Sequence, residues 1–104
     1  MPVELFHPPL DAVELDAVYA ALADRHRRAA VVRLARTPQA EVPCAALDLP
    51  GAKSTRSYHW KVLREAGLVL QRSSGTGMLL RLRPDFDRRF PGLLDNLLAL
   101  TDGQ

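Results

Sequence analysis

The sequence contains one cysteine, no long hydrophobic run and no low-complexity stretch in its 104 residues. Cys44 alone cannot form an internal disulfide, which fits a reducing compartment. No apolar run approaches the roughly 20 residues that a membrane-spanning helix needs. The first residues also lack the basic start and apolar stretch of a signal peptide. We therefore expect a cytoplasmic protein that does not engage a membrane.

The net charge is only +2, but it is unevenly distributed along the chain. Residues 51–83 hold seven Lys and Arg against Glu65 alone, whereas residues 1–50 and residues 84–104 each carry a net charge of −2. A basic middle between acidic flanks favours one anion-binding surface. The alternative is a solvated surface whose charge is uneven by chance.

Apolar residues at helical and strand spacing predict a chain of short elements. Residues 1–10, with three prolines, are predicted to form an arm, and residues 11–104 one domain. The predicted elements are helices over 11–23 and 24–35, a short helix over 43–49, a helix over 54–66, strands over 68–72 and 78–83, and one helix over 85–101 or two that break at Pro91-Gly92. Asp24 is the predicted N-cap of the second helix, and Gly67 the predicted end of the helix over 54–66.

This order predicts a mainly α fold with a small β-hairpin. A short helix, a tight turn and a second helix make a helix-turn-helix unit. The hairpin over 68–83 follows it directly, as a wing would. The pattern therefore predicts a winged helix-turn-helix.

The helix over 54–66 has one polar and one packing face. Ser57, Tyr58 and Lys61 fall on the polar side, opposite His59 and Leu63. A major groove is wide enough to admit such a helix. The residues expected to contact DNA here are Lys53, Ser54, Thr55, Arg56, Ser57, Tyr58 and Lys61. The alternative is a plain amphipathic surface helix.

Two arginines are expected near opposite sides of the hairpin turn over residues 73–77. Arg72 and Arg81 would reach a minor groove, whose negative potential attracts arginine. The alternative is that they only keep an exposed hairpin soluble.

Two segments resemble the ArsR/SmtB family of regulators. Residues 22–35, LADRHRRAAVVRLA, resemble its second-helix segment, and residues 54–69, STRSYHWKVLREAGLV, resemble its recognition helix. The resemblance implies a homodimeric winged-helix repressor that a small-molecule or oxidant inducer releases from double-stranded DNA. Arg56 departs from the family, which usually has an apolar residue there. On a helical wheel of residues 54–66, Arg56 falls near the centre of the packing face, from which it could extend outward to a phosphate.

The resemblance also implies dimerisation through the first and last helices. Leucines on more than one face of the last helix favour this independently. The alternative is a terminal helix fully absorbed into its own domain.

No metal site or cofactor is expected, because Cys44 has no paired cysteine and residues 85–104 contain no histidine. His59 matches a residue usual in the family and is interpreted as structural. Cys44 lies near a predicted helix start, where the helix dipole would favour a reactive thiolate that senses oxidants. The alternative is a small buried apolar residue.

Two other functions compete with DNA-binding regulation. One is a winged-helix protein-interaction or dimerisation module that does not bind DNA. The other is an enzyme in which Cys44 acts with His26 or His59. We do not expect catalysis, because no phosphate loop, paired carboxylates or Ser-His-Asp set accompanies them.

Overall fold

The computed structural model describes residues 5–75 and 77–103, so parts of the predicted arm and of the predicted hairpin turn lie outside the described residues. Its elements run in the order η1 (Leu10–Ala12), α1 (Leu15–Ala23), α2 (Arg25–Arg36), β1 (Val42–Pro43), η2 (Cys44–Leu47), α3 (Lys53–Glu65), β2 (Val69–Ser74), β3 (Gly77–Leu82), α4 (Phe86–Arg89) and α5 (Leu93–Asp102). The prediction of a mainly α chain with a β-hairpin is confirmed.

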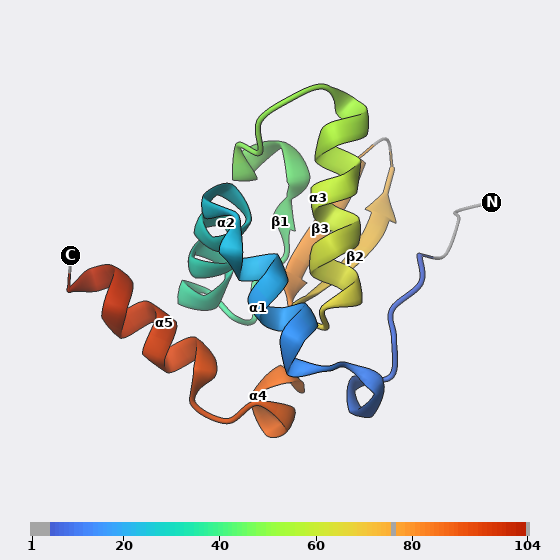
Figure 1. The fold of residues 1–104 in the computed structure, drawn as a ribbon. Helices are drawn as coiled ribbons and strands as arrows, with labels where there is room; N and C mark the ends of the chain where they lie inside the picture. Colours follow the sequence, from blue (N-terminus) through green and yellow to red (C-terminus); the bar gives the residue numbers. More distant parts are fainter. Residues whose placement is uncertain (1–4, 76, 104) are drawn as a thin grey trace.

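The sheet is antiparallel with the strand order β1-β3-β2. Gln71 of β2 stands opposite Leu80 of β3, and Val42 of β1 stands opposite Leu80 from the other side. Helix α3 lies across the sheet, and α5 lies on the opposite side of the body from the hairpin (Figure 1). The core between these layers is apolar, and its largest fully buried side chains are Phe86, Leu34, Leu63, Leu68 and Leu80.

The predicted capping residues lie at the helix ends, as the sequence predicts. The Asp24 carboxylate accepts hydrogen bonds from the backbone N–H groups of His26 and Arg27, at 2.8 and 3.0 Å. Gly67 ends the turn after α3 with φ +72°, and a Cβ there would lie 3.0 Å from Val13 and 3.2 Å from Leu10. Glycine is therefore required at this position for both conformation and space.

Several predicted boundaries are wrong. The helix predicted over 11–23 is two elements, because Val13 and Glu14 adopt extended backbone between η1 and α1. The helix predicted over 43–49 is a four-residue 3₁₀ helix after a short strand that the sequence did not predict. The chain breaks at Pro91-Gly92, where Gly92 has φ +81°, so the alternative of two terminal helices is confirmed.

Candidate nucleic-acid interface

The first turns of α3 are exposed, and its C-terminal half buries only one side. His59, Trp60 and Leu63 are buried against the body. The predicted contact residues of the first turns and Lys61 are all exposed: Lys53, Ser54, Thr55, Arg56, Ser57, Tyr58 and Lys61. The exposed surface carries hydroxyls, one phenol and three cationic groups. These groups can donate hydrogen bonds to the acceptor atoms of bases and phosphates.

Arg56 falls near the centre of the packing face on a helical wheel, and in the structure it is exposed, as the expected outward extension requires. Residues 53–58 are all exposed, and the buried positions of α3 begin at His59. The guanidinium is therefore open to solvent on the same surface as Lys53.

The hairpin arginines lie differently from the prediction. Arg72 stands opposite Leu79 and Arg81 opposite Leu70, so Arg81 lies further from the turn. Arg72 already forms a two-point ion pair with Glu41, with Nε–Oε2 2.6 Å and Nη2–Oε1 2.8 Å. The hydrogen bond from Arg72 lowers the pKa of Glu41. The pair is exposed, and a phosphate would compete with Glu41 for Arg72.

Residues that sequence reasoning missed hold α3 and the hairpin in place. Arg27 Nη1 lies 3.1 Å from Nδ1 of His59 and joins α2 to α3. The backbone N–H of Gln71 donates to Nε2 of His7 at 3.0 Å, which fastens the N-terminal arm along β2. Arg27 lies in a polar stretch and His7 in a proline-rich one, so no local signal distinguishes them from solvated residues.

Cys44 lies beside α3 and is half-buried. It lines a cavity of about 300 Å³ together with Lys53, Arg56 and Trp60. Gln71 Nε2 is 3.9 Å from its sulfur. Burial raises the pKa of Cys44, which outweighs the helix-end effect expected from sequence. The protonated thiol therefore predominates at neutral pH.

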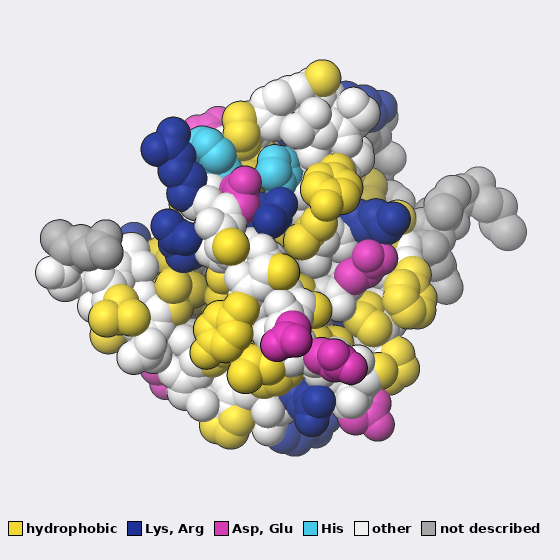
Figure 2. All heavy atoms as spheres, in the orientation of Figure 1, with side chains coloured by type: hydrophobic (Ala, Val, Ile, Leu, Met, Phe, Trp, Pro, Cys, Tyr) yellow, Lys and Arg dark blue, Asp and Glu magenta, His cyan; other side chains and the backbone are white. Residues whose placement is uncertain are grey.

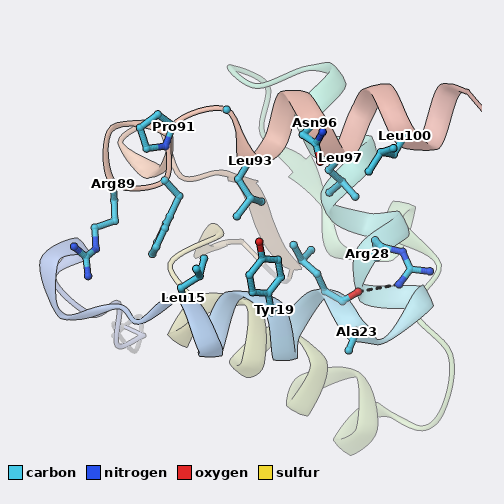
Figure 3. Close-up of a pocket in the computed structure, with 13 residues that line it drawn as sticks. Leu15, Tyr19, Ala23, Arg28, Arg89, Pro91, Leu93, Asn96, Leu97 and Leu100 are labelled. Carbon is cyan, nitrogen blue, oxygen red and sulfur yellow. Dashed lines mark hydrogen bonds between the residues drawn. The ribbon is translucent and has the colours of Figure 1, made fainter.

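A groove of about 690 Å³ separates α1 from α5. Leu15 and Tyr19 extend from α1 toward Leu93 and Leu97 of α5 (Figure 3). Three groove residues are unusually exposed for their size, namely Leu15 at 43%, Tyr19 at 59% and Leu100 at 61%. Hydrophobic side chains lie along α1 and the facing side of α5 (Figure 2). In a single chain, this apolar surface is exposed to solvent.

The described residues contain no group of three or more His, Cys, Asp or Glu side chains placed to hold a metal ion. Across residues 5–75 and 77–103, the helices are too short or too polar for any of them to span a bilayer.

Comparison with known proteins adds independent evidence. The chain is 39% identical over 97 residues to an HTH-type transcriptional regulator of Mycobacterium tuberculosis, covering 86% of this chain and 90% of that protein. It is 35% identical to an uncharacterized HTH-type transcriptional regulator of Bacillus subtilis, over 77% and 82% of the two chains. No family model matches the chain.

Solved structures agree with this likeness. The crystal structure of a possible transcriptional regulator for arsenical resistance has a TM-score of 0.59 and 30% identity, covering 88% of this chain and 98% of its own. An ArsR family transcriptional regulator has a TM-score of 0.64 and covers 95% and 99% of the two chains. At 19% identity, this second likeness concerns the fold alone.

Proposed function

Because this chain belongs to the ArsR family of winged helix-turn-helix transcriptional regulators, we propose that it is a homodimeric repressor that binds operator DNA through α3. The observation that carries the proposal is the exposed half of α3. Residues 53–58 and Lys61 are exposed on a helix that is held on the core by His59, Trp60 and Leu63. A rigidly held helix with free hydroxyl and cationic groups suits the major groove.

The hairpin is the proposed wing, in a modified form. Arg72 would exchange Glu41 for a phosphate when DNA approaches, and the loss of one exposed ion pair costs little. Arg81 is half-buried toward the base of the hairpin, and we leave it out of the proposed DNA contacts.

The groove between α1 and α5 is the proposed dimer interface. Tyr19 and Leu100 expose apolar surface there that a second copy would cover. Two-fold symmetry would then present two α3 helices to half-sites about 34–36 Å apart. Light scattering tests this with Tyr19→Asp, which should yield monomers, and the matched control Tyr58→Asp, which should leave the dimer intact.

Fluorescence anisotropy with DNA from upstream of the protein's own coding region tests the DNA contacts. Lys53→Ala and Lys61→Ala should weaken binding, and each should reduce the slope of log K against log salt by about one. Arg88→Ala is the control, because this arginine is exposed and its helix, α4, lies away from α3 (Figure 1). If both lysine variants bind as the parent does, the chain is better described as a dimerisation module.

A further inference from the structure

A second cavity, of about 620 Å³, lies between the end of α2, the base of β3 and the start of α5. Its apolar lining comes from all of these segments and the loops beside them: Ala35, Pro38, Leu82, Pro84, Leu94 and Leu98. Ligand sites commonly enclose about 300–1,000 Å³ and combine apolar walls with a few polar groups. The size and lining therefore suit a small organic molecule.

The cationic groups of this cavity are Arg81 and Arg83. Arg83 is already engaged, because its Nε lies 2.9 Å from Asp85 Oδ1 and its Nη1 donates to the carbonyl of Pro8 at 2.6 Å. Arg81 differs, because its Nε is buried and has no hydrogen-bond partner in the described part of the chain, and its charge also acts on Glu41, whose pKa it helps to lower. A buried donor without an acceptor destabilises the protein, and an anionic acceptor would remove that cost.

We propose that this cavity binds a small monocarboxylic acid with an apolar body. The carboxylate would accept hydrogen bonds from the Arg81 guanidinium, whose planar fork matches it. The apolar body would pack against Leu94 and Leu98 of α5. Asp87 and Asp95 are exposed and also line the cavity, so a ligand with more than one negative charge would be disfavoured.

The position of the cavity gives the ligand a means of regulation. It touches α5, which belongs to the proposed dimer interface, and β3, which belongs to the proposed wing. A bound acid would bias the relative placement of these two elements and so change DNA affinity. This consequence rests on the proposed function, whereas the binding site itself does not.

Isothermal titration calorimetry of the whole chain without DNA tests the site, with hexanoate as the probe. Hexan-1-ol and hexylamine are the length-matched controls without a carboxylate. Hexanoate should bind more tightly than both, and Arg81→Gln should weaken its binding tenfold or more. Arg88→Gln removes an exposed arginine outside the cavity and should leave hexanoate affinity unchanged.

Asp95→Asn provides a second test that does not alter the buried arginine. Removing a negative charge beside the site should raise hexanoate affinity. The proposal is overturned if hexan-1-ol binds as tightly as hexanoate, if folded Arg81→Gln keeps the parent affinity, or if Asp95→Asn weakens binding. Because DNA is absent, a failure here is distinct from a failure of the proposed repressor.

Discussion

Arg27 and His59 connect the second helix to the recognition helix through a contact of 3.1 Å between Nη1 and Nδ1. The same guanidinium donates through Nε to the carbonyl of Ala21 at 2.9 Å and through Nη2 to that of Ala20 at 3.3 Å. One side chain thus joins α1, α2 and α3. Nδ1 can accept only when the His59 proton is on Nε2. The orientation of the proposed DNA-contacting surface therefore depends on a residue that does not belong to it.

Arg27→Ala should destabilise the fold by about 2 kcal/mol, because charged hydrogen bonds to buried partners are lost. DNA affinity should also fall, since α3 loses one of its anchors. Chemical denaturation and fluorescence anisotropy measure the two effects. Arg25→Ala removes an exposed arginine from the same helix and is the control. Equal stability and equal DNA affinity of the two variants would contradict the role of Arg27 as an anchor of α3.

Asp24→Ala should cost about 1 kcal/mol at neutral pH, while Asp24→Asn should retain most of the capping effect. Hydrogen bonds from the backbone, chiefly that of Arg27, lower the pKa of Asp24 below 3.8 in the folded state. The ionised Asp24 side chain therefore stabilises the fold fully above the pKa that it has in the unfolded state. This stabilisation is lost as the pH falls through the lower pKa of the folded state. Denaturation between pH 6 and pH 3 should show a smaller acid-induced loss in Asp24→Asn, and an identical loss would argue against the ionic cap.

These cases show what the sequence can predict. Asp24 and Gly67 act through their own neighbours, so capping rules locate them. The break at Pro91-Gly92 is local for the same reason. The half-burial of Arg81 was not predicted, because it lies beside residues of α2 and α5, which are distant in sequence. The pairing of Arg72 with Glu41 depends on β1, a two-residue strand too short for any pattern to reveal.

His7 should make the attachment of the arm dependent on pH. Burial is the largest cause that lowers its pKa from 6.5, and Arg64 and Arg83 lower it further. The neutral ring accepts the Gln71 N–H, so this contact is intact above pH 6.5 and is lost as pH falls through the lower folded pKa. The hydrogen-exchange protection factor of the Gln71 amide should fall from pH 7.5 to pH 5. In His7→Ala it should be low and independent of pH, and the same pH-dependent loss in that variant would exclude His7 as the cause.

Cys44 should react slowly with iodoacetamide at neutral pH, because burial raises its pKa and leaves little thiolate. The rate should rise as pH increases toward 10, while free cysteine under the same conditions reacts faster at pH 7. Mass spectrometry gives the alkylation rate of Cys44 at each pH and that of free cysteine at pH 7. A Cys44 rate at pH 7 equal to or above that of free cysteine would support the oxidant-sensing hypothesis.

Two equally exposed tyrosines allow the central proposal to be tested in one measurement. Tyr58 is 60% exposed on α3 and Tyr19 is 59% exposed on α1. Each is replaced in turn by the photo-crosslinking residue p-benzoylphenylalanine, and the protein is irradiated with labelled operator DNA. The account predicts a protein–DNA crosslink from position 58, and from position 19 a crosslink to a second copy of the chain without DNA. A DNA crosslink from position 19 and none from position 58 would contradict it.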